Sequence, residues 1–297
     1  MRALLGLMAM AVGSCQSVAE PMVDVDQLIG QSARHSVADG ETLLDVARHG
    51  GMGYTELLAA NPGVDPWLPE QGREVMLPTA HILPSHTGPG VVVNVGDLRL
   101  YYFAPDGGPV RSWPIGVGRA GLETPVGTTS VTEMMVEPVW WPTAAARAED
   151  PELPGVVPPG PDNPLGSHAI RIGQGSYLIH GTNAPWGIGR RVSRGCVRMY
   201  PEDIALLFDL VKPGTPVTVV DEPVKLGWQG GHLYLEVHPS GDQVDQLEQT
   251  GTFVPAVVDQ LKVRVRDAAG DHRRRIDWSV VAATAEQRRG TPVRITR

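Results

Sequence analysis

The sequence of 297 residues is poor in cysteine, in basic residues and in long apolar runs, and each shortage excludes a class of protein. Two cysteines, Cys15 and Cys196, cannot form the disulfide network that holds small secreted domains together. Apart from residues 3–13, no apolar stretch approaches the roughly 18 residues that a membrane-spanning helix needs. We therefore do not expect an integral membrane protein.

Basic residues are outnumbered: 25 Lys and Arg face 33 Asp and Glu, and the net charge is −8. The excess of acid lies before residue 261, because residues 261–297 carry ten basic and four acidic side chains. So acidic a body argues against nucleic acid as a partner. The basic tail could contact anionic lipid or a polyanionic wall polymer, or it could be a solvated face; no function is assigned to it.

Three further absences narrow the chemistry. No Ser-x-x-Lys pattern occurs, which argues against a serine transpeptidase of the penicillin-binding type. Without a second thiol or a His-x-x-x-His pair, neither a metal site nor a cofactor is expected. The glycines of residues 116–121 fit the dinucleotide-binding fingerprint, but Thr124 and Pro125 follow soon after, where that fold requires a helix. They are interpreted as turn glycines.

The N-terminus has the order of a secretory signal: Met1 and Arg2, an apolar run, then small residues. Residues 17–19 suit an ordinary signal peptidase, which would make residues 1–19 the signal peptide. Residues 12–15 instead resemble a lipoprotein box, in which Cys15 is lipidated. Both alternatives predict export, either as a soluble protein or as one anchored through Cys15.

Cys196 is left without a disulfide partner, because Cys15 is removed or acylated in both cases. An unpaired thiol is unusual in an oxidising compartment, so Cys196 is a candidate nucleophile. The alternative is a buried, inert thiol.

The length is enough for two cores, and 35 glycines with 27 prolines favour turns and short strands. Residues 34–79 predict strand, helix, helix, strand, with Thr42 capping the first helix and Asn61-Pro62 ending the second. Together with His35-x-Val37 and Gly40-x-Thr42-Leu43, this unit resembles a LysM module, a family that binds N-acetylglucosamine chains. A generic small α/β unit is the alternative.

A second domain is predicted over residues 91–221, after a linker at residues 82–90. It is expected to begin with a hairpin and to contain several short strands, one helix that begins at Pro201 and ends by Pro213-Gly214, and a proline-rich lid at residues 137–164. Residues 222–297 form an appended segment of unknown role, with a strand expected from His232 to Val237.

The informative stretch pairs a histidine with the lone thiol. His180 ends an apolar strand and Cys196 follows 16 residues later, a spacing that suits two strand ends meeting at one sheet edge. A thiol attacks an amide only as thiolate, so either its pKa falls or a base such as His180 takes its proton. Gly195 allows a tight turn that directs N–H groups at a developing oxyanion.

This stretch resembles the catalytic motif of the L,D-transpeptidases, the YkuD-type domain, in which a His-Gly pair precedes a Ser-x-Gly-Cys-x-Arg segment. The motif positions are filled by His180, Gly181, Ser193, Gly195, Cys196 and Arg198. Arg194 stands where many relatives have a histidine, and a cation there is expected to favour the thiolate.

The resemblance implies an α+β, β-rich chain: a small LysM βααβ module followed by a YkuD-type β-sandwich catalytic domain. It implies that Cys196 attacks the diaminopimelate carbonyl of a peptidoglycan tetrapeptide stem, that His180 is the base and that the carbonyl of Gly181 orients the imidazole. Carbapenems acylate enzymes of this family. The remaining candidates for substrate binding or the oxyanion hole are Ser193, Arg194, Gly195, Arg198 and Asn183, with ordinary loop salt bridges as the alternative for the arginines.

With the LysM-like unit, the chain resembles the proteobacterial subgroup that includes enzymes attaching an outer-membrane lipoprotein to peptidoglycan, which places it in the periplasm. The acyl acceptor could be a second stem, a lipoprotein lysine or water. Two other functions compete: a papain-like endopeptidase, against which the order His before Cys counts, and a non-catalytic wall-binding protein.

Overall fold

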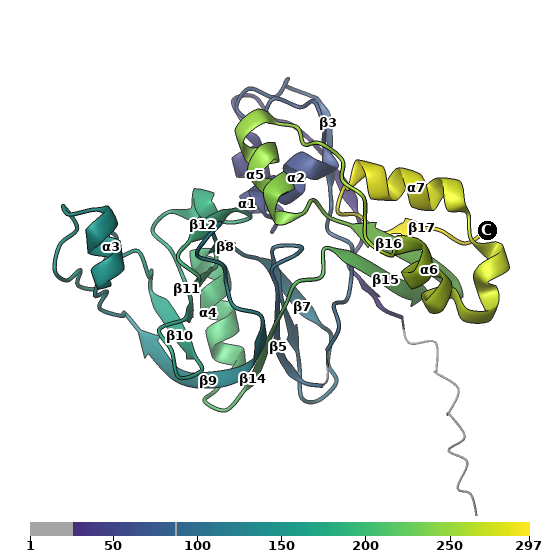
Figure 1. The fold of residues 1–297 in the computed structure, drawn as a ribbon. Helices are drawn as coiled ribbons and strands as arrows, with labels where there is room; N and C mark the ends of the chain where they lie inside the picture. The colour runs from purple at the N-terminus through teal and green to yellow at the C-terminus, as the bar shows by residue number, and fades with distance from the viewer. Residues whose placement is uncertain (1–25, 87) are drawn as a thin grey trace, which may run out of the picture.

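The computed structural model describes residues 26–86 and 88–297, arranged as a central sheet domain with smaller units at its N- and C-terminal ends (Figure 1). The expected signal peptide and the lipoprotein box at Cys15 fall outside these residues. Within the described ranges, no helix is long and apolar enough to cross a membrane. The α-helices are α1 Leu43–His49, α2 Tyr54–Ala60, α3 Ala144–Glu149, α4 Pro201–Leu210, α5 Gly241–Thr250, α6 Leu261–Ala269 and α7 Trp278–Gln287. The strands are β1 Leu28–Ile29, β2 Ala33–Ser36, β3 Glu74–Leu77, β4 His81–Ile82, β5 Gly90–Asn94, β6 Arg99–Phe103, β7 Arg111–Pro114, β8 Val117–Gly118, β9 Gly127–Val136, β10 His168–Ile172, β11 Leu178–His180, β12 Arg191–Ser193, β13 Val197–Arg198, β14 Pro216–Val220, β15 Val224–Gln229, β16 His232–Val237 and β17 Val293–Arg294.

The N-terminal unit has the predicted order of strand, helix, helix, strand, with β2 antiparallel to β3. Thr42 is the N-cap of α1: its hydroxyl accepts from the N–H of Asp45, whose carboxylate in turn accepts from the Thr42 N–H. The amide of Asn61 donates to Leu57 and Met76 carbonyls and so ties the end of α2 to β3. All seven residues of α2 are buried, so this helix is covered on every side.

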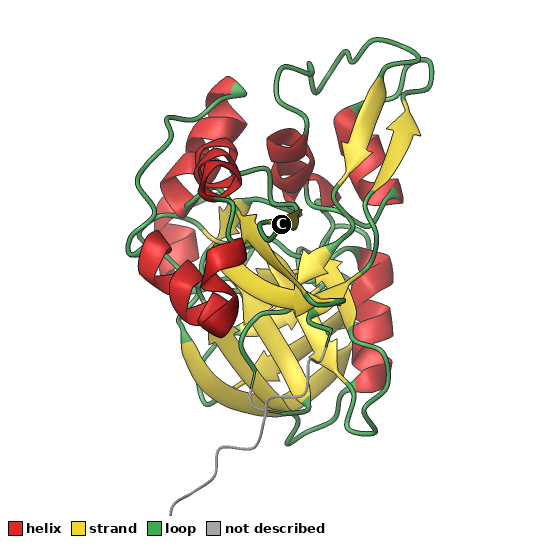
Figure 2. Ribbon diagram, turned by 90° about the vertical axis from the view of Figure 1, so that its right-hand side faces the viewer, coloured by secondary structure: helices red, strands yellow, loops and turns green. Residues whose placement is uncertain are grey.

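The central domain is built on an eight-stranded sheet in the order β13-β11-β10-β9-β14-β5-β6-β7, which curls around helix α4 (Figures 1 and 2). The predicted hairpin is β5-β6, and the helix from Pro201 to Leu210 is α4, with Ile204 and Leu207 buried against the sheet. The predicted lid at residues 137–164 contains the short helix α3 and projects from the sheet at the far left of Figure 1.

The C-terminal residues, which the sequence analysis left without a role, form a further unit with its own core. Strands β15, β16 and β17 form an antiparallel sheet, and α6 and α7 pack on it through Val265, Ala269 and Val281. The strand expected from His232 to Val237 is β16. Helix α5 leaves this unit and lies against α2, where Leu247 joins the core of the N-terminal unit.

The prediction that a linker begins at residue 82 is wrong for its first residue. His81 and Ile82 form β4, which pairs with β1 and packs against β16, and both side chains are almost completely buried. The connection from the N-terminal unit to the central domain therefore begins with a buried strand, β4. The α+β, β-rich class is confirmed.

Candidate active site

Two neighbouring parallel strands bring the predicted base and the predicted nucleophile to one sheet edge. Strand β11 ends at His180, and Cys196 immediately precedes β13, with His180 opposite Arg198. Side chains alternate along a strand, so Ile179 and Val197 enter the main core while His180 and Cys196 share the other face. His180 thus stands at the end of β11 and Cys196 just before the start of β13, so the two residues are offset by two positions along this parallel pair.

His180 is buried, and its Nδ1 lies 2.6 Å from the carbonyl oxygen of Gly181. A carbonyl can only accept, so Nδ1 carries the proton and Nε2 keeps a free lone pair. Burial, together with the nearby charge of Arg198, lowers the pKa of His180 to about 4. The imidazole is therefore neutral at neutral pH.

Cys196 is a free, partly exposed cysteine whose Sγ lies 3.9 Å from the carbonyl oxygen of Ser176. Burial raises the pKa of the thiol, and the opposing effects of the Leu178 backbone and of Arg198 are smaller. The expectation that Arg194 favours the thiolate stays a prediction; in this structure its guanidinium pairs with Glu149, which offsets its charge. At rest the site thus holds a thiol beside a neutral imidazole.

The turn before Cys196 is held by Ser193 and Gly195. The Ser193 hydroxyl accepts from the Gly195 N–H at 3.1 Å and donates to the Cys196 carbonyl at 2.5 Å. Gly195 has φ +100°, and a Cβ there would lie 2.7 Å from the ring of Tyr177. Ser193 therefore closes the turn, and Gly195 is the residue type that this backbone and the neighbouring ring allow.

Arg198 carries a largely buried positive charge without a carboxylate partner within the described residues. Burial lowers the pKa of its guanidinium, and its Nε has no hydrogen-bond partner there. Its backbone exchanges hydrogen bonds of 2.9 and 2.8 Å with Gly116. Such a cation beside the thiol can bind an anionic group of a substrate.

Asn183 lies under the lid. Its amide donates to the carbonyl of Asp162 at 3.1 Å, and it lines a groove of about 520 Å³ together with Trp140 and Val157. Asn163, buried in the same segment, donates to the carbonyl of Pro138 and closes the base of the lid. Asn183 is thus next to a groove and not bonded to the nucleophile loop.

Arg119 and Glu149 are site residues that the sequence analysis missed. The lid residue Glu149 forms ion pairs with both Arg119 and Arg194. Nothing in the local sequence marks this contact, because Glu149 is separated from Arg119 by 30 residues. The glycine-rich residues 116–121 do have a packing reason: a Cβ on Gly116 would lie 2.6 Å from the Gly187 carbonyl oxygen, and one on Gly118 would lie 2.2 Å from that of Leu122.

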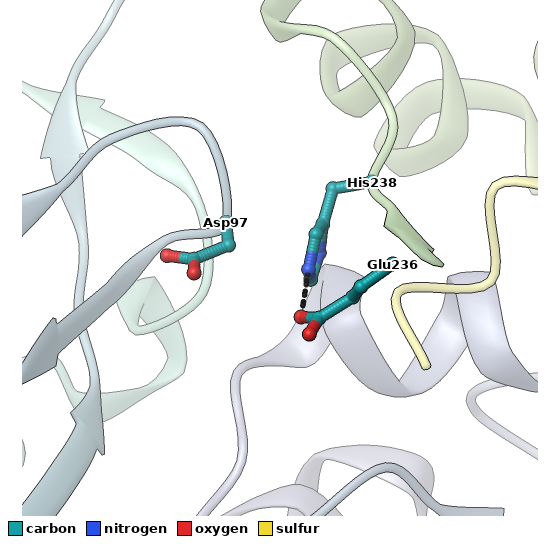
Figure 3. Close-up of side chains that lie close together, drawn as sticks. All are labelled: Asp97, Glu236 and His238. Carbon is teal, nitrogen blue, oxygen red and sulfur yellow. Dashed lines mark hydrogen bonds and ion pairs between the residues drawn. The ribbon is translucent and has the colours of Figure 1, made fainter. Parts of the chain in front are cut away.

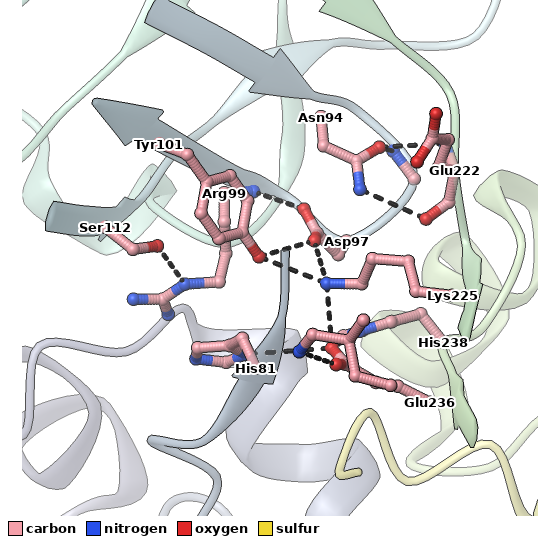
Figure 4. A network of polar contacts seen from close by, with 12 residues as sticks. His81, Asn94, Asp97, Arg99, Tyr101, Ser112, Glu222, Lys225, Glu236 and His238 are labelled. Atoms are coloured by element: carbon pink, nitrogen blue, oxygen red, sulfur yellow. Dashed lines mark hydrogen bonds and ion pairs between the residues drawn. The ribbon is translucent and has the colours of Figure 1, made fainter. Parts of the chain in front are cut away.

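One group of side chains away from the thiol has a metal-like arrangement. Asp97, Glu236 and His238 are buried and bring their ligand atoms within 4.8 Å of one another (Figure 3). However, the ammonium group of Lys225 lies 2.7 Å from Asp97 and 3.0 Å from Glu236, where a metal ion would otherwise sit (Figure 4). The group is an ion-pair cluster that joins β5-β6 to the C-terminal unit.

Comparison with known proteins identifies the family. The model of the YkuD L,D-transpeptidase catalytic domain matches residues 88–219. The probable L,D-transpeptidase YcfS of Escherichia coli K12 is 39% identical over 282 residues, which cover 91% of this chain and 86% of that protein. ErfK/SrfK of the same strain is 41% identical, covering 91% and 88%, and YbiS is 39% identical, covering 96% and 95%.

These relatives extend over nearly the whole chain, including the C-terminal unit, so the likeness is not confined to the catalytic domain. The chain belongs to the L,D-transpeptidase family, whose enzymes act on peptidoglycan.

Proposed function

We propose that Cys196 and His180 carry out the acyl transfer. In the first step the Cys196 proton passes to Nε2 of His180 while sulfur attacks the diaminopimelate carbonyl of a tetrapeptide stem. The C–N bond then breaks, His180 returns the proton to the amine of the leaving D-alanine, and the stem remains as a thioester. The proposal is supported by the parallel pairing of β11 with β13, which puts both side chains on one face of the sheet, and by the Gly181 carbonyl, which accepts from Nδ1–H of His180.

In this mechanism the thiolate forms during attack rather than beforehand. A base with a pKa of about 4 beside a thiol of raised pKa leaves both groups neutral at rest. Stabilisation of the oxyanion that forms during attack then depends on hydrogen-bond donors and positive charge near the nucleophile. The turn at Gly195 and the unpaired guanidinium of Arg198 are the groups we assign to that role, while Asn183 is assigned to the lid groove.

An amine resolves the thioester in the second step, with His180 now taking the proton of the attacking amine. The acceptor is either the side-chain amine of a second stem or a lysine of a lipoprotein; water would give a carboxypeptidase. The proposal includes export to the periplasm through the N-terminal signal, either free or anchored at Cys15.

The decisive experiment is mass spectrometry of a disaccharide-tetrapeptide incubated with the mature protein, with and without a lysine-ended acceptor peptide. A stem dimer that lacks one D-alanine supports wall crosslinking, a stem–peptide conjugate supports protein anchoring, and free tripeptide alone supports hydrolysis. Each product should vanish in Cys196→Ala. If no product depends on Cys196, the chain is a non-catalytic wall-binding protein.

We further propose that the N-terminal unit binds glycan chains as a LysM module. Its βααβ order and its exposed Trp67, a surface on which a sugar ring can stack, support this. Sedimentation of full-length Cys196→Ala with purified sacculi should fall when Trp67→Ala is added. Trp141→Ala in the lid, another exposed tryptophan, is the matched control. Equal sedimentation of all three proteins would contradict the proposal.

A further inference from the structure

Arg119 and Arg194 are held side by side by the backbone. Strands β8 and β12 are parallel, with Gly118 opposite Ser193, and each arginine is the first residue after the end of its strand. The N–H of Arg119 donates to the Ser193 carbonyl at 3.0 Å, which continues the pairing past the strand ends. Adjacent strands are about 4.8 Å apart, so two positive side chains leave neighbouring points of the backbone.

Two cations held this close repel each other unless an anion lies between them. That anion is Glu149, the last residue of α3. Both of its carboxylate oxygens accept from Nη2 of Arg119, at 2.8 and 2.7 Å, and the same carboxylate pairs with Arg194. Its pKa is lowered by these partners. The lid is therefore fastened at this point to the turn that carries the nucleophile.

The pairing is accessible to water. The exposed fractions are 44% for the side chain of Arg119, 30% for Arg194 and 50% for Glu149. Ion pairs exposed to this degree contribute little to stability, so a competing carboxylate can replace Glu149. Arg194 is only two residues before Cys196, so the Cα atoms of these two residues are at most about 7 Å apart.

We propose that Arg119 and Arg194 bind a free carboxylate of the acyl-donor peptide, and that Glu149 is the resident carboxylate which the donor displaces. The identity of the donor rests on the function proposed above; the anion site itself does not. A tetrapeptide stem offers two such groups, the terminal carboxylate of the leaving D-alanine and the side-chain carboxylate of diaminopimelate. Displacement of Glu149 frees α3, so donor binding and release of the lid are one event.

The site can be tested without any transpeptidase activity, by alkylating Cys196 with iodoacetate and with iodoacetamide. The reagents differ in charge, and the ratio of their rates, read by intact mass, reports the electrostatic potential at the thiol. Glu149→Gln should raise the ratio of iodoacetate to iodoacetamide rates about threefold to tenfold at low salt, because two guanidiniums lose their counter-ion. Arg119→Gln and Arg194→Gln should each lower it.

Matched controls carry the same charge changes outside this contact. The controls are Glu152→Gln and Arg111→Gln. Glu152 lies in the same lid and Arg111 on β7, and neither residue forms an ion pair within the described parts of the chain. Both should leave the ratio at the wild-type value. A ratio that changes equally in Glu149→Gln and Glu152→Gln, or that stays constant in all variants, overturns the proposal.

A second experiment identifies which donor carboxylate is bound. The tetrapeptide stem is compared with forms amidated at the D-alanine terminus or at the diaminopimelate side chain. Arg119→Gln should raise KM about tenfold for the free-acid donor and leave KM unchanged for the form that lacks the recognised carboxylate. If Arg119→Gln affects all three donors alike, the arginines do not bind the donor, even where the alkylation ratios show an anion site and the stem is still turned over.

Discussion

In the proposed mechanism, the protonation state of one residue, His180, sets the acid limit of the reaction. Its pKa of about 4 means that Nε2 is free to accept the thiol proton at every pH well above 4, and that protonation removes the base below it. We expect the rate of Cys196 acylation by a carbapenem to be constant from about pH 6 to about pH 8 and to fall as pH drops through about 4. Intact mass at timed intervals measures this rate.

The fold must be monitored in the same series. The pKa of His180 is about 6.5 in the unfolded chain and about 4 in the folded protein, so the unfolded chain binds the proton more readily. The free energy of unfolding therefore decreases as the pH drops from about 6.5 to about 4. Circular dichroism at each pH separates loss of the base from loss of the fold. An acylation midpoint near pH 6.5 in folded protein would show that the imidazole is not buried in the reacting state.

A second prediction for a single residue concerns Gly195. Its backbone is in the left-handed region, and an added Cβ would meet the ring of Tyr177 at 2.7 Å, so Gly195→Ala should shift the nucleophile turn. We expect acylation of Cys196 to slow about 100-fold, the cost of a displacement near 1 Å. Gly175→Ala is the control, because its Cβ would meet the same ring at an ordinary 3.4 Å. Equal rates in the two variants would contradict this role of the turn.

Sequence reasoning found the residues that a local pattern marks. His180, Gly181, Gly195 and Cys196 stand in one motif, and their contacts follow from strand alternation and turn geometry. The partner of Arg194 could not be predicted in this way, because Glu149 reaches it from a lid that has no periodic pattern. The raised pKa of the thiol also depends on burial, which the motif does not encode.

Among the elements, the segment of residues 188–191 has the most consequence for the site, since it lies between the two reacting residues. Helix α2 holds one end: the Thr55 hydroxyl donates to the Gly189 carbonyl at 2.6 Å. Helix α5 holds the other through Arg190–Glu248 at 2.6 Å and Arg191–Asp245 at 3.0 Å. Two helices from opposite ends of the chain thus fix the route from His180 to Cys196.

A double-mutant cycle on Arg191 and Asp245 tests this clamp. Arg191→Gln and Asp245→Asn should each slow Cys196 acylation several-fold, and the double variant should be no slower than either single one, because they remove the same contact. The coupling is expected to be about 1 kcal/mol, since the pair is partly exposed. Asp242→Asn, an exposed acid on the same helix, is the control. Additive effects would mean that the two residues act separately.

Helices and strands with a clear periodicity of apolar residues were predictable from the sequence, and very short strands were not. The side-chain cap of α1 at Thr42, and the first-turn proline and apolar face of α4, can be recognised in the sequence. Strands β8, β12 and β13 have two or three residues each, too few for any alternation to show. These short strands nevertheless carry the nucleophile turn and the two arginines, so the site depends on the elements that sequence reasoning could not find.

At the scale of the whole molecule, the buried ion-pair cluster around Lys225 links the central domain to the C-terminal unit. The Lys225 ammonium lies between Asp97 and Glu236, and Tyr101 donates its hydroxyl to Asp97 (Figure 4). The same region holds Glu56 of α2 against Arg99 at 2.9 Å, which ties in the N-terminal unit as well. All of these groups are buried.

Lys225→Met should therefore be strongly destabilising. It keeps the length of the side chain but leaves Asp97 and Glu236 facing each other without a cation, and breaking a buried pair costs about 3–5 kcal/mol. Urea unfolding measures the loss, and Lys212→Met at an exposed lysine should be near neutral. A loss below about 1 kcal/mol would show that the two carboxyls take up protons or water at little cost.

The sequence predicted separate N-terminal and catalytic units but not how they are joined. Leu247 and Phe253 complete the core of the N-terminal unit from at least 170 residues away, and no pattern in residues 34–79 reveals the missing partner. For this reason a fragment ending near residue 84 would expose α2, and wall binding has to be measured on the full chain.

The same interlocking of chain ends constrains how an exported chain can acquire its fold. Gln27 bonds to the backbone of Trp228, 201 residues later, and α2 stays uncovered until Leu247 has emerged. Contacts so distant in sequence close late and slowly. In the export proposed above, a chain that crosses a membrane from its N-terminus would leave its first unit unfinished for most of the passage, exposed to proteases and to other unfolded chains. The N-terminal unit is complete only once residue 247 is available, so it and the catalytic domain become complete at about the same time.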